Sequence, residues 1–178
     1  MATNAPASTL EIRRLDHLDD ARLQSLADVL VDCVEGGASV SFMLPITRQK
    51  ALAFWRKVAD GVARGERILL VAEDAQGIAG TVQVIVDQPE NQPHRADVAK
   101  MLVHRRARRR GLGEALMRAA EAAARHAGKT LLVLDTGDDT AARLYTRLGW
   151  QAAGRIPRYA LMPEGGDCAT TFYYRDLA

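Results

Sequence analysis

The most concentrated group of residues able to do chemistry is the stretch HRRARRRGLG. Five of the seven residues from His104 to Arg110 are arginine, and Gly111 and Gly113 follow at once. Guanidinium groups bind phosphates through paired N–H groups, and glycine lets a ligand approach the backbone because no Cβ is in the way. If a helix begins at Leu112, its first N–H groups have no partner in the helix and carry the positive end of its dipole. The stretch therefore predicts a pyrophosphate site.

Two plainer interpretations of this stretch stay open. Gly-x-Gly before a helix can be simple turn punctuation, and a run of arginines is usually a solvated face or a nucleic-acid patch. The position of the run, directly between an apolar strand and the glycines, favours the phosphate site. No Gly-Lys-Ser/Thr follows, which excludes a Walker-type loop, and Leu116 stands where a dinucleotide fingerprint needs its third glycine.

The segments on either side alternate between strand and helix patterns in the order βααβββαβαββ. Strands are expected at 10–15, 67–74, 78–86, 95–104, 130–135, 150–161 and 168–175, and helices up to Gly36 and at 47–64, 111–128 and about 139–148. The crossover between 95–104 and 130–135 is long enough to make these two strands parallel. The continuous apolar run at 130–135 is typical of a strand covered on both faces.

The chain has 178 residues and no internal composition break, which predicts a flexible tail at 1–8 and a single domain at 9–178. No segment approaches the roughly 18 apolar residues of a membrane helix, and the first residues lack a secretory pattern. Cys33 and Cys168 stand alone, which argues against a disulfide scaffold or a zinc module. We therefore expect a cytoplasmic protein with no membrane partner.

The basic character of the chain is local. The net charge is +2, and without the five arginines it would be −3. Such a distribution favours a compact anion over a long polyanion. Aromatic residues make up only 5% and none lies among the arginines, so platforms for base stacking are missing.

Two motifs together carry a family resemblance. The pattern Arg108-x-x-Gly111-x-Gly113, after a strand ending in Met101-Leu102-Val103, resembles the acetyl-CoA signature of the GCN5-related N-acetyltransferases (GNAT). A second motif of that superfamily resembles Ala141-x-x-Leu144-Tyr145-x-x-x-Gly149-Trp150. More narrowly, the chain is similar along nearly its full length to the tabtoxin-resistance acetyltransferase group, through GGASVSFM, RADVAKMLV, LDT and IPRYALMPEGG.

The resemblance implies an α/β (α+β) GNAT fold: a mixed, mostly antiparallel sheet of about seven strands with four helices, in which 95–104 and 130–135 are parallel and splayed. It also implies acetyl-CoA as cosubstrate and no metal. The backbone of the first strand would pair with the pantetheine arm. The expected cofactor residues are Met101, Leu102, Val103, Arg108, Arg109, Arg110, Gly111, Leu112 and Gly113.

Acetyl transfer to an amine needs a deprotonated amine and a protonated leaving thiolate. Asp97 and Asp135 lie on the two splayed strands, and we expect them to hold the acceptor ammonium, with at least one serving as base. The alternative is that each only ends or faces out of a strand. Tyr145 resembles the family's general acid; the alternative is that its ring only packs in the core.

The acceptor residues are expected to be Phe42, Tyr159 and Tyr173 together with the two aspartates, although each aromatic ring could equally be packing. Two positions depart from the family pattern: Arg105 stands where Pro is frequent and Asp138 where Asn is frequent, so Asp138 is left out of the cofactor residues.

The resemblance implies transfer of the acetyl group of acetyl-CoA to a primary amine of a small, amino-acid-like molecule, by direct attack in a ternary complex. The same prediction includes a role in toxin or antibiotic resistance. It also includes a homodimer in which C-terminal edge strands pair between subunits. One alternative is a protein N-terminal or lysine acetyltransferase. Another is a nucleic-acid-binding module that uses Arg105–Arg110. The main prediction, by contrast, includes no nucleic-acid partner.

Overall fold

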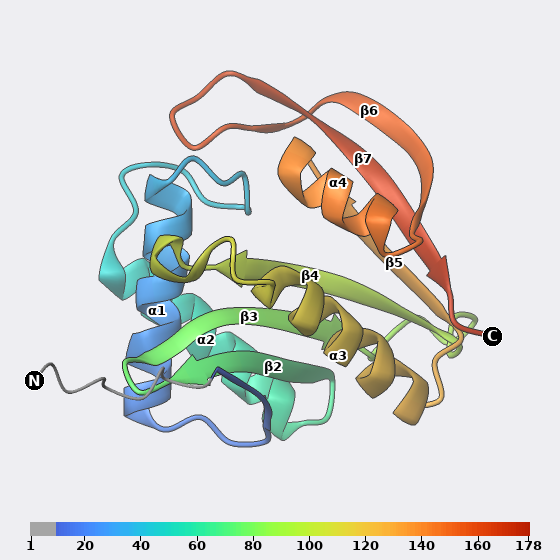
Figure 1. Cartoon of the computed structure of the whole chain (residues 1–178), viewed down its shortest axis with the longest axis horizontal. Helices are drawn as coiled ribbons and strands as arrows, with labels where there is room; N and C mark the ends of the chain where they lie inside the picture. Colours follow the sequence, from blue (N-terminus) through green and yellow to red (C-terminus); the bar gives the residue numbers. More distant parts are fainter. Residues whose placement is uncertain (1–9) are drawn as a thin grey trace, which may run out of the picture.

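Seven strands form one sheet in the order β1-β2-β3-β4-β5-β7-β6 (Figure 1). The computed structural model describes residues 10–178, so the predicted tail at 1–8 lies outside the described residues. The strands are β1 (Glu11–Leu15), β2 (Arg67–Asp74), β3 (Gly77–Ile85), β4 (Arg95–Val103), β5 (Leu131–Thr136), β6 (Gln151–Leu161) and β7 (Asp167–Asp176). The helices are α1 (Asp20–Glu35), α2 (Arg48–Ala63), α3 (Leu112–His126) and α4 (Asp139–Arg147), with a 3-10 turn η1 at Arg105–Ala107.

Neighbouring strands are antiparallel except β4 and β5, which run parallel as predicted. Their pairing covers three residues on each strand and ends at the pair Asp97 and Val133. Beyond that pair the two strands diverge, and Figure 1 shows the opening between them. The expected fold class, including the splayed parallel pair, is confirmed.

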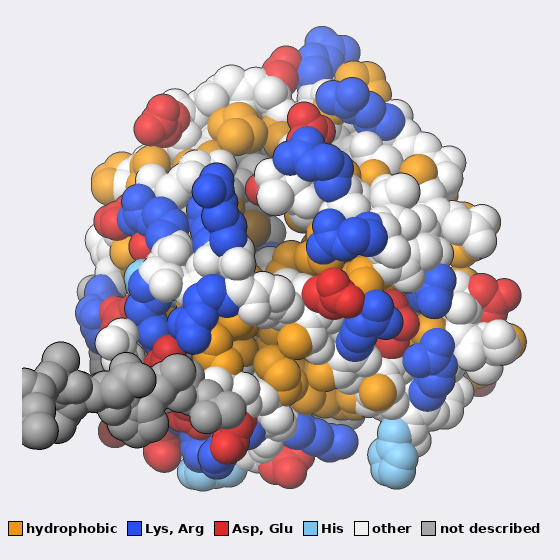
Figure 2. Space-filling view, in the orientation of Figure 1, with side chains coloured by type: hydrophobic (Ala, Val, Ile, Leu, Met, Phe, Trp, Pro, Cys, Tyr) orange, Lys and Arg blue, Asp and Glu red, His pale blue; other side chains and the backbone are white. Residues whose placement is uncertain are grey.

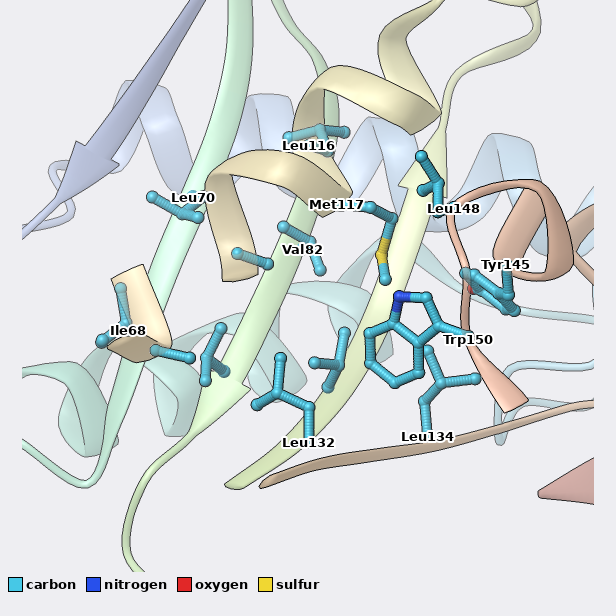
Figure 3. Packing of buried hydrophobic residues seen from close by; sticks show 14 of the residues in the cluster. Ile68, Leu70, Val82, Leu116, Met117, Leu132, Leu134, Tyr145, Leu148 and Trp150 are labelled. Carbon is cyan, nitrogen blue, oxygen red and sulfur yellow. The ribbon is translucent and has the colours of Figure 1, made fainter. Parts of the chain in front are cut away.

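Helices α3 and α4 cover one face of the sheet. A stripe of apolar side chains on α3, with Leu116 and Met117 fully buried, packs on β2 to β5 (Figure 3). Trp150 joins this core, and its Nε1 donates a hydrogen bond of 3.0 Å to Oε1 of the buried Glu121 on α3. This bond satisfies both polar groups and ties the end of α4 to α3.

Helices α1 and α2 cover the other face, but only over the β1–β4 half. Their apolar sides pack together and against β2, β3 and the end of β4. On β5, Leu132 and Leu134 are buried on the α3 face, whereas Val133 is partly buried and Asp135 exposed. The expectation that this strand is covered on both faces is wrong, because neither α1 nor α2 extends over it.

Side-chain caps and glycines set the helix ends. Asp19, Thr47 and Asp138 accept backbone N–H groups at the starts of α1, α2 and α4. After α4, Gly149 has a φ of 84°, and its carbonyl accepts a 2.8 Å hydrogen bond from Arg175. The positive φ favours glycine there, and a Cβ would also force the Arg175 guanidinium to shift.

In residues 10–178 no helix combines the length and the apolar character that crossing a bilayer would need.

Candidate active site

The far half of β4 has one unpaired edge. Past Asp97, no strand in residues 10–178 pairs with the side of β4 that faces β5. The predicted cofactor strand Met101–Val103 lies in this half, beyond the last parallel pair. Its backbone can therefore hydrogen-bond to an extended ligand lying between the two strands, as an added strand would.

A β-bulge in β4 changes which side chains face which helix layer. Lys100 and Met101 together stand opposite one residue of β3, because Ala99 pairs with Gln83 and Leu102 with Thr81. Lys100 has a φ of 52°, a conformation that is uncommon for a residue with a side chain. Such bulges re-aim side chains and are frequent beside active sites.

The burial pattern shows the effect of the bulge. Before it, Ala96 and Val98 are buried in the core under α3; after it, the odd-numbered Met101 packs against that core, while Leu102 is buried under α1 and α2. Unbroken alternation would send Lys100 into the α3 core. Instead its side chain lies on the α1–α2 side, where the sheet is open.

Lys100 lies at the centre of this open side. Its Nζ is 3.1 Å from Oγ of Ser41 in the α1–α2 loop and 5.8 Å from the ring centre of Phe54 on α2. Burial lowers the pKa of Lys100 below its ordinary value, and the negative charge of Asp135 partly offsets this. Lys100 and Asp135 thus lie on the two strands of the splay, β4 and β5, and carry opposite charges.

Asp135 ends the apolar part of β5 and is exposed. Its Oδ2 accepts a 3.1 Å hydrogen bond from Oγ1 of Thr170 on β7, which is buried and fixes the carboxylate in place. No ion pair neutralises it among the residues that the structure describes. Because it is exposed, fixed and unpaired, it can bind an ammonium group.

Asp97, the second predicted carboxylate, has a different environment. It is ion-paired with Arg95, and its Oδ2 accepts a 3.2 Å hydrogen bond from Gln88. Gln88 and Arg95 also hydrogen-bond to each other, which closes the group. Asp97 lies at the last parallel pair with β5, so it marks the start of the splay.

Tyr145 extends from α4 to the α3 side of the splay. Its ring is 5% exposed and packs against Trp150 and Tyr173, with ring centres 6.1 and 5.9 Å away; Figure 3 shows Tyr145 beside Trp150. Burial first, and then the charges of Asp138 and Asp135, raise the pKa of Tyr145 well above its ordinary value. The hydroxyl is therefore held protonated, which is the state a proton donor needs.

Two loops meet above the splay. Leu44 N donates to Pro163 O at 2.9 Å and Ser39 Oγ to Leu161 O at 3.1 Å, which joins the α1–α2 loop to the β6–β7 turn. Figure 2 shows a hollow in the molecular surface in this region, between the β4–α3 connection and the β6–β7 hairpin. The open side of the sheet is thus bounded by loops from both halves of the chain.

The three predicted acceptor aromatics lie at different depths. Phe42, in the α1–α2 loop, packs edge-on against Phe54 at 5.3 Å and so lies near Lys100. Tyr159 is 50% exposed and packs on Phe172, the residue paired with Asp135. Tyr173 is 7% exposed and lies in the core behind Tyr145. Contact of each with an acceptor stays a prediction.

The five arginines divide into two groups. Arg105 is paired with Asp32 at 2.8 Å and Arg106 with Asp74 at 2.7 Å, which fixes η1 to α1 and β2. Arg105 thus stabilises the turn at the position where the family often has proline. The other three, Arg108, Arg109 and Arg110, are exposed and have no ion pair within residues 10–178.

These three arginines lead into the N-terminus of α3. Arg109 and Gly111 have φ values of 60° and 76°, so the chain makes two left-handed turns just before the helix. Backbone N–H groups in such turns form concave anion sites, and open space surrounds Gly111. Gly113 has a further role, because a Cβ there would come within 2.9 Å of Leu144 on α4.

Asp138, set aside among the predicted cofactor residues, accepts two backbone hydrogen bonds as the cap of α4. Residues 10–178 contain no group of three or more acidic, histidine or cysteine side chains placed to hold a metal ion. Lys100 and Thr170 were missed by the sequence reasoning. The signal for Lys100 was a charged residue at a position where alternation within RADVAKMLV requires an apolar one.

Comparison with known proteins agrees with this architecture. Residues 65–152 match the family model of the acetyltransferase (GNAT) domain. A proposed acetyltransferase from Salmonella typhimurium, solved with its cofactor acetyl-CoA, superposes with a TM-score of 0.77 at 20% identity, over 96% of this chain and 95% of that one.

Two further solved structures have different acceptors in their names. A ribosomal-protein-alanine N-acetyltransferase from Brucella melitensis has a TM-score of 0.75 at 22% identity, over 94% of this chain and 99% of the other. A proposed phosphinothricin N-acetyltransferase has a TM-score of 0.77 at 18% identity, over 96% and 99%. At these identities the likeness establishes the fold, and the family match adds the domain type. The chain therefore has the fold of these acetyltransferases, and its residues 65–152 match the model of the GNAT acetyltransferase domain.

Proposed function

We propose that the protein transfers the acetyl group of acetyl-CoA to a primary amine of a small, amino-acid-like molecule, by direct attack in a ternary complex. The observation that carries this proposal is the unpaired edge of β4 beyond Asp97, which leads to the α3 N-terminus and three exposed arginines without an ion pair in the described chain; of these, Arg108 donates to Val103 O at 3.2 Å. The acetyl-CoA found with the Salmonella neighbour, on the same fold, supports the choice of donor.

The residues present fit a CoA thioester. Met101–Val103 offer backbone groups along a free strand edge, which suits the amides of a pantetheine arm. Arg108, Arg109 and Arg110 and the first N–H groups of α3 suit a pyrophosphate, with Gly111, Leu112 and Gly113 at the contact. The donor supplies an activated acetyl group, and the rest of the chemistry falls to the side chains around the splay.

Asp135 is assigned to the acceptor amine. An alkylammonium has a pKa of about 10.4, so the acceptor amine is protonated when it arrives at neutral pH. The exposed carboxylate, fixed by Thr170, can bind this ammonium and take its proton, directly or through water. Asp97 remains the second candidate, although its carboxylate is already engaged by Arg95 and Gln88.

Tyr145 is assigned to the leaving thiolate. Its raised pKa keeps the phenol protonated, and its position on α4 places it on the opposite side of the splay from Lys100. No described residue hydrogen-bonds to the hydroxyl, which leaves its proton available for the sulfur. The ring stays in place because Trp150 and Tyr173 pack against it.

A protein acceptor is the alternative with the same chemistry. The two neighbours with named acceptors superpose almost equally well, so the fold does not decide between them. The hydrogen bonds that join the α1–α2 loop to the β6–β7 turn favour a small acceptor, because a bridged rim restricts an extended peptide. A role in toxin or antibiotic resistance, a cytoplasmic location and a homodimer are further parts of the proposal.

A nucleic-acid module using the arginine run has less support. Arg105 and Arg106 hold Asp32 and Asp74 within the fold, so the run does not form one continuous basic strip. Binding to DNA through phosphates would weaken steeply with added salt, whereas binding of a CoA ester depends less on salt.

The direct test is calorimetry with CoA and acetyl-CoA, followed by thiol release from acetyl-CoA with amino acids, polyamines, aminoglycosides and peptides. We expect heat with both CoA forms and release with a small amine. No heat from folded protein would overturn the proposal, and release with peptides alone would select the protein-acceptor alternative.

A further inference from the structure

The charge of Lys100 lacks an acidic partner in the described part of the chain. Its Nζ contacts a neutral hydroxyl, that of Ser41, and the face of Phe54. No carboxylate lies within ion-pair distance of it in residues 10–178. A partly buried ammonium with only neutral partners loses hydration that these partners do not fully replace.

The neighbouring acids do not supply the missing anion. Asp97, three residues earlier in β4, is paired with Arg95 and Gln88. Asp135 influences Lys100 electrostatically, but it lies on the other strand of the splay and is held by Thr170. Lys100 and Asp135 therefore remain a separated pair of opposite charges on the two strands of the splay.

The position of Lys100 is a built feature of the strand. The bulge places two residues opposite one in β3 and gives Lys100 a positive φ, and both carry an energetic cost. The result is an ammonium on the α1–α2 side of the sheet, on the side of Asp135 and away from Tyr145. It is also the side on which the exposed Asp135, assigned above to the acceptor amine, lies.

We propose that Lys100 is the anion-binding residue of the acceptor site, and that the acceptor carries a carboxylate as well as its amine. The inference rests on the proposed function. Asp135 holds the acceptor ammonium on one strand and Lys100 its carboxylate on the other, so the site is complementary to a zwitterion. The acceptor carboxylate displaces water from Lys100 and provides the negative charge that no described residue provides.

The test compares acceptors that differ in one group. Each standard amino acid is assayed beside its carboxamide, with wild type, Lys100→Met and Lys100→Arg. We expect wild type to prefer the acids. Lys100→Met should lower kcat/KM for an accepted acid about tenfold or more, chiefly through KM, and change the matched carboxamide little. Lys100→Arg should keep most of the preference, because it keeps the charge.

Controls separate this inference from the proposed function. Lys57→Met removes an exposed lysine from α2 and should leave both acceptors unaffected. Calorimetry with CoA should give the same affinity for Lys100→Met as for wild type, and thermal unfolding should show that the variant folds; Lys100→Gln serves if it does not. Loss of CoA binding in wild type would refute the proposed function itself.

Two results would overturn the role of Lys100 while the enzyme remains an acetyltransferase. One is a wild type that acetylates amines with no preference for the carboxylate member of a pair. The other is an equal fall for acid and carboxamide in Lys100→Met, mainly in kcat, which would make Lys100 a group in proton transfer.

Discussion

The two halves of β4 differ in how completely their polar groups are paired. Up to Asp97 the strand is bonded on both edges, and the Asp97 carboxylate is ion-paired with Arg95 and accepts a hydrogen bond from Gln88. Beyond Asp97 one edge is free, and Lys100 and the facing Asp135 have no ion-pair partner in the described chain. The first half is built for stability, and the second leaves donors, acceptors and charge for a ligand.

The arginine run repeats this division on a shorter scale. Arg105 and Arg106 are used within the fold, whereas Arg108–Arg110 are exposed beside the α3 N-terminus. In both places the chain changes from structural pairing to free groups within a few residues. Neighbouring arginines therefore have different roles. Whether an arginine has an ion-pair partner within the fold distinguishes the two groups.

The largest effect is expected from the same Asp→Asn change made on β5, at Asp135, and on β4, at Asp97. Asp135→Asn keeps an oxygen for Thr170 but removes the charge and the base, so we expect turnover to fall about 100-fold or more. Asp97→Asn should keep turnover within a few-fold. Initial rates with acetyl-CoA and an accepted amine measure both. A large loss in Asp97→Asn with unchanged stability would make Asp97 the base instead.

Tyr145→Phe removes a proton donor and keeps the ring between Trp150 and Tyr173. General acid catalysis typically contributes about 100-fold or more to the rate. The variant should therefore lower kcat about 100-fold, while the Kd for CoA stays the same. Stopped assays and calorimetry give the two values. A full-speed variant would leave Tyr145 with a packing role only.

The division within the arginine run can be sharpened with a matched pair of variants. Arg109→Ala with Arg110→Ala should raise the Kd for CoA about tenfold, because charge-assisted hydrogen bonds to phosphate are lost. Arg106→Ala should leave that Kd unchanged and lower the melting temperature, since it breaks the pair with Asp74. The opposite pattern would reverse the assignment of the two groups.

The smallest expected effect is on how stability depends on pH, through the ion pair between Arg106 and Asp74. Hydrogen bonds from Arg106 hold the pKa of Asp74 below its ordinary value of 3.8. The ionised carboxylate is thus favoured in the folded state, so its contribution to stability is complete above the ordinary pKa and lost as pH falls through the lowered one. Between about pH 5 and pH 3, wild type should lose more unfolding free energy than Asp74→Asn in urea titrations. Equal slopes would contradict this pairing.

Much of the fold followed from periodicity. The strand predicted at 67–74 is β2 with the same bounds, and the other helices and strands were placed to within a few residues at each end. The strand–helix–strand order also predicted the parallel pair, because parallel neighbours need a long crossover, which is usually a helix. The one-sided burial of β5 was not foreseen, because an apolar run does not tell how far the neighbouring helix layer extends.

The site was harder to predict because it depends on local irregularity. Period-two alternation would place Lys100 under α3, and only the bulge turns it to the other side. Likewise, the sequence presents Asp97 and Asp135 as equivalent acids on adjacent strands. Their difference comes from Arg95, which pairs with Asp97, and from Gln88, which lies in a connecting segment and reaches Asp97 only in the folded chain.

The bulge also constrains how this enzyme can diversify. If the bulge were straightened without removal of a residue, the two sides would be exchanged for everything after it, sending Leu102 toward α3 and Met101 toward α1 and α2. Deleting Lys100 itself would instead keep Met101 toward α3 and Leu102 toward α1 and α2, and would remove only the extra residue and its ammonium. Position 100 can therefore change, or be lost, without exchanging the two core-facing sides of β4.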